Sequence, residues 1–284
     1  IPLRGNEIDS VATPKSSIMQ VGWFVMRGLR LAEILRRHWA LLLLCFMFFM
    51  SVYLRVGWPA FIIGDAGHDD QLFVNLAGEL VRGNWLGPYN MLTHAKGPFF
   101  SFFVALTYGA AVPLKLAEHL LFLLASLAFA LIAGRLARSR GLAVLLFFLL
   151  AFAPVLWGGD LARIIREPLY CSLTLFCFAA FAAAFMDRDD VGVGNAAWPM
   201  RWPSRTFWAA VLGVSAGGFW LTREEGIWLL PALAFATACL ALRAYLARGS
   251  ESILDWPTAR RVMVASGLAV SIIIAVNSAN YFKY

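Results

Sequence analysis

Residues 39–56 read WALLLLCFMFFMSVYLRV, and residues 114–134 read LKLAEHLLFLLASLAFALIAG. Both runs are continuously apolar, and each is close to the roughly 20 residues that a helix needs to cross the hydrocarbon core of a membrane. Lipid offers no partners to unpaired backbone groups, so only helices and closed barrels span it, and a continuous apolar run is typical of a helix. These stretches predict an all-α, polytopic transmembrane helical bundle.

The composition of the whole chain agrees with this prediction. Of 284 residues, 61% are hydrophobic and 14% charged, whereas a soluble domain is only about half apolar. The net charge of +7 could indicate nucleic acid, but Arg and Lys cluster in short loops beside apolar runs, where they set orientation and meet anionic headgroups. We therefore expect membrane lipids, and no nucleic acid, among the partners.

Apolar length and flanking charge predict about seven crossings. The apolar run 99–113 is short, and we interpret it as a re-entrant or interfacial helix. This places every Arg-rich loop on the cytoplasmic side, as the positive-inside bias requires, whereas one more crossing would turn three such loops outward. The predicted crossings are 39–56, 114–134, 141–157, 168–186, 206–221, 227–243 and 262–279.

This threading predicts the domain organisation and the location. A cytoplasmic N-terminal segment covers residues 1–38, and a transmembrane domain, expected to be incomplete at its C-terminus, covers residues 39–284. The chain is expected to be an integral, multi-pass membrane protein with its N-terminus in the cytoplasm. The outer face then carries three charged segments, at residues 57–98, 158–167 and 222–226.

The first outer loop contains a predicted amphipathic helix that lies on the membrane. Asp69 and Asp70 come at its first turn. Adjacent helical residues point about 100° apart, so one aspartate can face a substrate while the other caps the helix or binds an ion. A carboxylate near apolar walls can act as a general base; simple helix capping is the alternative. The apolar residues at helical spacing are Phe73, Leu76, Ala77, Leu80 and Val81.

Three further residues of this loop are candidates for ligand binding. His68 and His94 could hold a divalent metal such as zinc or manganese together with a nearby aspartate. Their spacing matches no compact ligand motif, so ordinary hydrogen-bonding histidines are the alternative. Lys96 precedes Gly97 and Pro98 at a helix entrance, where its compact charge could hold a phosphate or anchor the helix to lipid.

The second outer segment, GGDLARIIREPLY, spaces its charges as on a helix. Asp160 and Arg163 are three residues apart, Arg163 and Glu167 are four apart, and Arg166 lies between them. Arginine also recognises phosphate with a planar, bidentate fork. Pairing within the segment and phosphate binding by Arg163 and Arg166 both fit this pattern.

The third outer segment, TREEG, is a turn between two helices that otherwise lack charge. It contains Arg223, Glu224 and Glu225. Charged side chains between apolar membrane helices cost free energy unless they pair with each other or serve in binding or catalysis. We therefore regard these three residues as further candidates for the site.

The string DDQLFVNLAGELVRGNWLGPYNMLTHAKGPFFSFFVAL resembles the first outer loop of the GT-C superfamily of glycosyltransferases. These polytopic enzymes use polyprenyl-phosphate-linked sugars, and the members that the string resembles include family 39-like protein O-mannosyltransferases and lipid A aminoarabinose transferases, which implies a location in the inner (plasma) membrane of a bacterium. Gly97 stands where the family has a proline, and Asp70 where glutamate is commoner. The resemblance covers residues 64–134, and its motif residues are Asp69-Asp70, Gly83-Asn84-Trp85, Pro88-Tyr89 and Lys96-Gly97-Pro98.

The resemblance implies an inverting glycosyltransferase that moves a sugar from a polyprenyl-phosphate donor to a hydroxyl of a glycan, lipid or protein. In that family an outer-loop aspartate acts as, or near, the catalytic base, and an acidic residue of the second loop assists. These roles would fall to Asp69 or Asp70 and to Asp160. We expect the donor phosphate near Lys96, Arg163 or Arg166, and we add Tyr89 of the Pro-Tyr turn as a candidate.

Two other function classes fit parts of the sequence. A transporter or lipid flippase would carry charged or helix-breaking residues near the bilayer midplane, where the predicted crossings are nearly all apolar. A non-catalytic membrane scaffold would use the outer charges only to cap helices and to pair with each other. Asp→Asn substitutions that abolish activity in a folded, inserted protein would distinguish an enzyme from a scaffold.

Overall fold

The computed structural model describes most of the chain after residue 37. The chain divides into two units, Ile1–Leu42 and Leu43–Tyr284, and the boundary falls inside the first described helix, His38–Arg55. All contacts reported below lie within the second unit. The described residues are 33, 38–62, 69–89, 93, 96–186, 202–223, 231, 235, 238, 242 and 256–284.

All the regular structure of these residues is helical, which confirms the predicted all-α class. Two short 3₁₀ turns, Pro154–Trp157 and Gly159–Ala162, connect the fifth and sixth helices, and one isolated β-bridge joins Phe61 to Arg163. After the helix His38–Arg55, the α-helices are α2 (Asp69–Val81), α3 (Phe99–Gly109), α4 (Leu114–Leu136), α5 (Arg140–Ala151), α6 (Glu167–Phe185), α7 (Arg205–Thr222) and α9 (Trp256–Lys283).

Among the described residues, five helical segments are long and apolar enough to cross a membrane, in agreement with five of the predicted crossings. Helix α7 forms where a crossing was predicted but is not among these five. The crossing predicted at 227–243 lies outside the described stretches, so the total of about seven stays a prediction. The five segments are His38–Arg55, Leu114–Leu136, Arg140–Trp157, Glu167–Phe185 and Thr258–Lys283.

Helix α3 is too short to cross. Its 11 residues span about 16 Å at 1.5 Å per residue, against a hydrocarbon core about 30 Å thick. This agrees with the interpretation of residues 99–113 as a segment that enters or lies on the membrane without spanning it.

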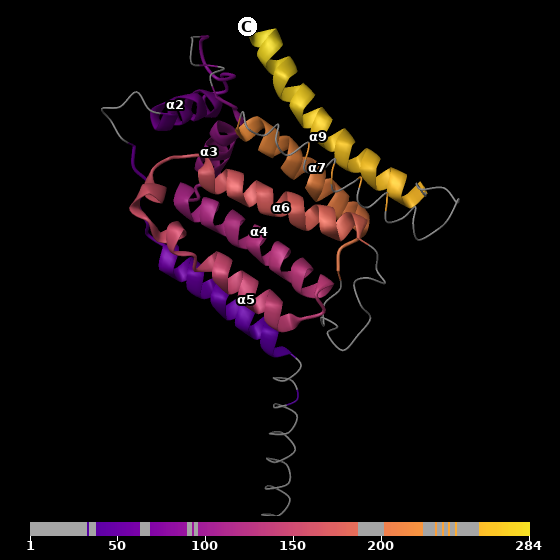
Figure 1. The fold of residues 1–284 in the computed structure, drawn as a ribbon. Helices are drawn as coiled ribbons and strands as arrows, with labels where there is room; N and C mark the ends of the chain where they lie inside the picture. The colour runs from indigo at the N-terminus through magenta and orange to yellow at the C-terminus, as the bar shows by residue number, and fades with distance from the viewer. Residues whose placement is uncertain are drawn as a thin grey trace, which may run out of the picture. The chain divides into compact units, whose positions relative to one another are not determined.

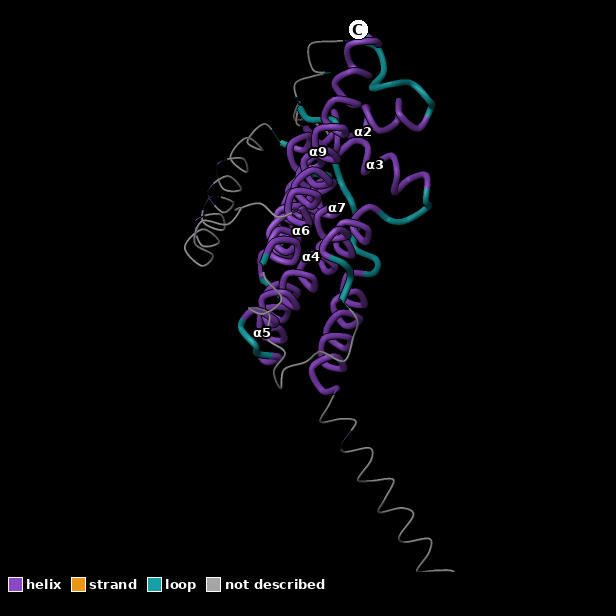
Figure 2. Tube along the Cα trace, turned by 90° about the vertical axis from the view of Figure 1, so that its right-hand side faces the viewer, coloured by secondary structure: helices purple, strands orange, loops and turns teal. Residues whose placement is uncertain are grey.

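The longer helices of the second unit pack in a row. Helix α4 lies between α5 and α6, α6 contacts α7, and α7 contacts α9, an arrangement that Figures 1 and 2 show from two directions. Helices α2 and α3 pack on each other, and α3 also contacts α4 and α7. Helices α2 and α3 therefore lie at the end of the row where α6 begins and α7 ends.

Glycines of α7 allow its neighbours to approach closely. A Cβ atom on Gly213 would lie 2.5 Å from the carbonyl oxygen of Ala265 in α9, and one on Gly218 would lie 2.7 Å from the ring of Phe99 in α3. Small residues at helix contacts are typical of membrane bundles, where close van der Waals packing replaces the hydrophobic effect. Helix α7 is thus held between α9 and α3.

Helix α2 confirms the amphipathic segment predicted in the first loop. Phe73, Leu76 and Ala77 are buried, and the ring of Phe73 packs edge-on against that of Phe100 in α3, with centroids 4.9 Å apart. The apolar stripe therefore faces protein. Val81, predicted on the same stripe, is exposed because α2 ends at that residue.

Candidate active site

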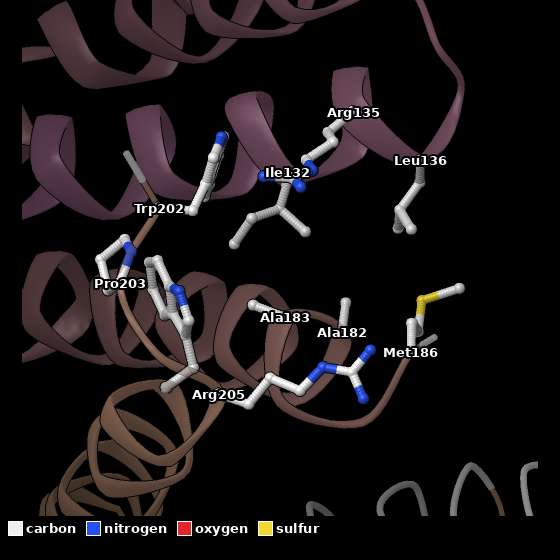
Figure 3. Close-up of a pocket in the computed structure, with 10 residues that line it drawn as sticks. Ile132, Arg135, Leu136, Ala182, Ala183, Met186, Trp202, Pro203 and Arg205 are labelled. Carbon is white, nitrogen blue, oxygen red and sulfur yellow. The ribbon is translucent and has the colours of Figure 1, made fainter. Parts of the chain in front are cut away.

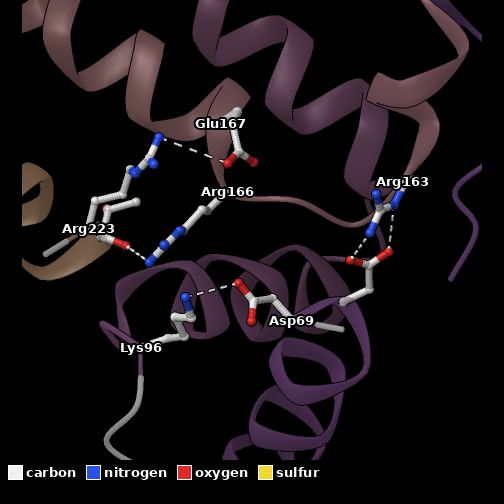
Figure 4. A network of polar contacts seen from close by, with 8 residues as sticks. Asp69, Lys96, Arg163, Arg166, Glu167 and Arg223 are labelled. Carbon is white, nitrogen blue, oxygen red and sulfur yellow. Dashed lines mark hydrogen bonds and ion pairs between the residues drawn. The ribbon is translucent and has the colours of Figure 1, made fainter. Parts of the chain in front are cut away.

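Asp70 forms a buried ion pair with Arg163, in which both carboxylate oxygens are used. Arg163 Nε donates to Asp70 Oδ2 over 3.0 Å, and a terminal nitrogen donates to Oδ1 over 2.8 Å. The Asp70 side chain is 1% exposed and that of Arg163 is 27% exposed. A bidentate pair of this kind is strong and geometrically specific. Asp70 therefore fixes the position of Arg163 (Figure 4).

The backbone around Arg163 is held by two other parts of the chain. Phe61 N–H donates to Ala162 O over 3.1 Å, and Ile164 N–H donates to Phe61 O over 3.2 Å. On the other side, the Lys115 ammonium of α4 donates to the carbonyl oxygen of Arg163. The segment is thus extended where it carries Arg163, and its position depends on contacts distant in the sequence.

The prediction that Arg163 and Glu167 share a helical face is wrong. Helix α6 begins only at Glu167, with Pro168 in its first turn. Proline lacks a backbone N–H and fits a helix only at its start, where that donor would have no partner. Glu167 instead approaches Arg223 across the site, with 4.0 Å between the charged atoms.

Asp69 points away from Asp70 and pairs with the lysine at the entrance of α3. Lys96 Nζ lies 3.2 Å from Asp69 Oδ2, and the two side chains are 28% and 46% exposed. An exposed ion pair of this kind contributes only about 0.2–1 kcal/mol, because water competes for both charges. Asp69 is consequently the accessible member of the aspartate pair, and a ligand can displace Lys96 from it at small cost.

Gly97 has a geometric reason to be glycine. A Cβ atom at this position would lie 2.1 Å from the carbonyl oxygen of Leu221, so no side chain fits where the chain passes the end of α7. This close approach ties Lys96, the preceding residue, to the C-terminal end of α7.

Arg166 joins the start of α6 to the same end of α7. It is buried, and its guanidinium donates to the carbonyl oxygen of Thr222 over 3.1 Å. Figure 4 shows the side chains of Lys96 and Arg166 directed towards the same space. The candidates that these contacts bring together are Asp69, Asp70, Lys96, Arg163, Arg166 and Arg223.

The remaining candidates are not part of this network or are not described. Tyr89 is exposed, and its ring lies 5.2 Å from that of Tyr284. Asp160 lies in the 3₁₀ turn Gly159–Ala162, but its side chain is outside the described set. Among the residues that the structure describes, no three His, Cys, Asp or Glu gather as metal ligands. His68, His94, Glu224 and Glu225 lie outside the described residues.

Sequence reasoning missed a buried charge pair near the start of α4. Lys115 Nζ lies 2.8 Å from a carboxylate oxygen of Glu118, and both side chains are at most 3% exposed. The other carboxylate oxygen of Glu118 has no hydrogen-bond partner within the described part of the chain. The next residue, His119, lies 2.9 Å from the hydroxyl of Ser51 through its Nε2. The signal was the presence of ionisable residues inside a predicted crossing, which usually marks a functional or structural role.

A comparison of the chain with protein-family models, with curated proteins and with solved structures finds no match. The function is therefore inferred from the residues of the site and their contacts.

Proposed function

We propose that this chain is a GT-C-type membrane glycosyltransferase that uses a polyprenyl-phosphate-linked sugar. The observation that carries the proposal is the meeting of an accessible carboxylate, Asp69, with Lys96 and Arg166 at one end of apolar helices. A carboxylate beside two cations suits a reaction in which a hydroxyl loses a proton while a phosphate departs.

In this proposal Asp69 is the base and Asp70 is a positioning residue. The Asp70 side chain is 1% exposed and both its oxygens accept from Arg163, so an acceptor hydroxyl has little access to it. Asp69 takes the proton of the acceptor hydroxyl, and the hydroxyl oxygen attacks the anomeric carbon. The bond from that carbon to the phosphate oxygen breaks, and polyprenyl phosphate leaves from the opposite side, which inverts the configuration.

The phosphate of the donor is assigned to Lys96 and Arg166, since Arg163 is committed to Asp70. Charge that develops on the departing phosphate is stabilised by these two cations, which is commonly the largest electrostatic contribution to such a reaction. As the phosphate binds, Lys96 exchanges Asp69 for the phosphate, and this exchange releases Asp69 to accept a proton. The polyprenyl tail would lie in the membrane beside the apolar helices.

The predicted order of membrane crossings gives the proposed location of this site in the cell. Arg-rich loops on the cytoplasmic side put the N-terminus there and the site on the outer face of a bacterial inner membrane. The acceptor is then a glycan, a lipid or a protein that reaches this face. The charges of Lys115 and Glu118 lie within the first five residues of α4, near one end of this predicted crossing, whereas a transporter would place such groups near the midplane. Enzyme chemistry is therefore favoured over transport.

The proposal is tested by sugar transfer in membranes that contain the chain. Radiolabelled polyprenyl-phosphate sugars are supplied, and release of polyprenyl phosphate is measured for the unmodified chain, Asp69→Asn and Glu79→Gln. Glu79 is a matched control, because it is a carboxylate of the same helix that accepts hydrogen bonds from Arg82 and Asn84. Loss of a general base slows transfer by about 100-fold or more.

We expect that loss for Asp69→Asn and an unchanged rate for Glu79→Gln. Equal rates for the unmodified chain and Asp69→Asn would remove Asp69 from the reaction. If the unmodified chain releases no polyprenyl phosphate from any donor, the proposed function is wrong.

A further inference from the structure

The connection between α5 and α6, residues 152–166, is held by buried cations of two earlier helices. Arg55, at the end of the first described helix, donates to the carbonyl oxygen of Leu156 over 2.7 Å. The Lys115 ammonium of α4 donates to the carbonyl oxygen of Arg163. Both donors are buried. A buried charged donor without an acceptor costs free energy, so these two bonds fix the course of the connection.

Lys115 makes two contacts that have different consequences. Its Nζ lies 2.8 Å from Glu118 Oε2, three residues later on the same helix, where side chains are neighbours. The bond to the Arg163 carbonyl instead joins α4 to a residue 48 positions later. A compact ammonium with three donors can serve both acceptors at once. The first contact balances the buried charge within α4, and the second positions the backbone of Arg163.

The position of Arg163 reaches the candidate active site through Asp70. The Arg163 guanidinium donates twice to the Asp70 carboxylate, over 3.0 Å and 2.8 Å (Figure 4), and two parallel bonds tolerate little displacement of either partner. Asp70 is the second residue of α2, and Asp69, the proposed base, is the first. A shift of Asp70 therefore reorients the first turn of α2 and moves Asp69 with it.

The residues assigned to the donor phosphate are anchored on α7 instead. Arg166 donates to the carbonyl oxygen of Thr222 over 3.1 Å, and Lys96 precedes Gly97, which passes close to the backbone of the same helix. Loss of the Lys115 bond should therefore displace the base and spare the phosphate ligands. The kinetic result is a lower kcat with an unchanged KM for the donor, as expected when an interaction is lost only in the transition state.

We propose that Lys115 is a positioning residue of the transfer reaction. Its ammonium fixes the Arg163 carbonyl, Arg163 fixes Asp70, and Asp70 sets the orientation of Asp69 towards the acceptor hydroxyl. Glu118 compensates the charge that this role requires inside α4. This role rests on the proposed function, because it serves the same site.

The test separates charge balance from positioning by removing the whole ion pair. Lys115→Met combined with Glu118→Leu replaces both charges with apolar side chains, which commonly keeps the stability of a buried pair, but it also removes the donor to Arg163. Thermal unfolding and sugar transfer are measured for this double variant and the unmodified chain. We expect a similar Tm, an unchanged donor KM and a kcat roughly 10- to 100-fold lower, the loss expected from a misplaced reacting group. A kcat that recovers together with Tm would overturn the proposal.

Arg261→Met is the matched control for the loss of a buried cation. Arg261 is buried in α9 and donates to the carbonyl oxygen of Ala184, near the end of α6. Figure 3 shows this end of α6, where Ala183 lines a pocket. The 19 residues of α6 separate it from Arg163 by about 28 Å. Arg261→Met should lower Tm and leave kcat unchanged, and a kcat as low as that of the double variant would overturn the proposal.

A thermal cycle without donor tests the link from Lys115 to Asp70 independently of sugar transfer. The fall in Tm caused by Asp70→Asn is measured in the unmodified chain and in the background Lys115→Met, Glu118→Leu. Because Lys115 positions Arg163 for Asp70, the fall should be smaller in that background by about 2 °C or more. Equal falls would overturn the proposal, whether or not the chain transfers sugar. A smaller fall in a chain that transfers no sugar would retain the link and reject only the proposed function.

Two further variants of Lys115 keep these tests decisive. If the double variant does not fold, Lys115→Gln with Glu118→Gln replaces it, because two amides can pair with each other while glutamine ends one bond short of the lysine ammonium. It should show the lower kcat and the smaller fall in Tm, and the absence of both would overturn the proposal. Lys115→Arg keeps a cationic donor at the Arg163 carbonyl and should keep most of the rate, whereas a loss as large as that of the double variant would contradict a donor role.

Discussion

Replacing Asp70 by Asn should destabilise the protein, because it removes the buried carboxylate that forms the bidentate pair with Arg163. Removal of one member of a buried ion pair costs about 3–5 kcal/mol. The Arg163 side chain is 27% exposed and can regain some hydration, so we expect the lower limit, about 3 kcal/mol. In domains of comparable size 1 kcal/mol shifts Tm by about 2–4 °C, so the Tm of Asp70→Asn should fall by roughly 6–12 °C.

The assay is thermal unfolding in detergent, followed by circular dichroism. Asp70→Asn, Arg163→Gln and the double variant are compared with the unmodified chain. Because the two side chains contact each other, the loss in the double variant should be smaller than the sum of the two single losses. Asp69→Asn serves as the internal control and should shift Tm little, since its pair with Lys96 is exposed. A Tm of Asp70→Asn equal to that of the unmodified chain, or strictly additive losses, would refute this reasoning.

Three further tests concern the packing of the bundle and its buried charge pair. Gly97→Ala places a Cβ atom 2.1 Å from an α7 carbonyl oxygen and should lower the free energy of unfolding by about 1–3 kcal/mol or more. Sugar transfer should also slow, because Lys96 is displaced. Thermal unfolding measures the first effect and the transfer assay the second. Lys115→Met leaves Glu118 buried without its partner and should cost about 3–5 kcal/mol in thermal unfolding, whereas the double change with Glu118→Leu should recover most of that loss. Gly213→Ala should lower Tm because its Cβ would lie 2.5 Å from a carbonyl oxygen of α9. Gly267→Ala, where no atom lies within 4 Å of the added Cβ, should leave Tm equal or slightly raised. A lower Tm for both variants would show that the close approach is not the cause.

The features that could be predicted from the sequence are local. The period of Phe73, Leu76 and Ala77 gives the extent and the buried face of α2, because side chains three and four residues apart share one side of a helix. Apolar length and flanking charge located the five described helices that are long and apolar enough to cross a membrane, because both signals lie within each segment. The first-turn position of the two aspartates also follows from their place at the start of this pattern.

The contacts that assign roles to the aspartates could not be predicted in this way. Asp70 and Arg163 are 93 residues apart, and they meet only because Phe61 and Lys115 hold the backbone of the second loop. Helical spacing placed Arg163 and Glu167 on one helix, which is wrong because α6 begins only at Glu167. No local pattern encodes such pairings.

The most direct test of the central claim is an experimental structure of the chain with bound polyprenyl phosphate. The account predicts phosphate oxygens at about 2.7–2.9 Å from Lys96 Nζ and from the Arg166 guanidinium, the usual distance for charge-assisted hydrogen bonds, with the Asp69 carboxylate released from Lys96. A phosphate bound away from these residues would contradict it.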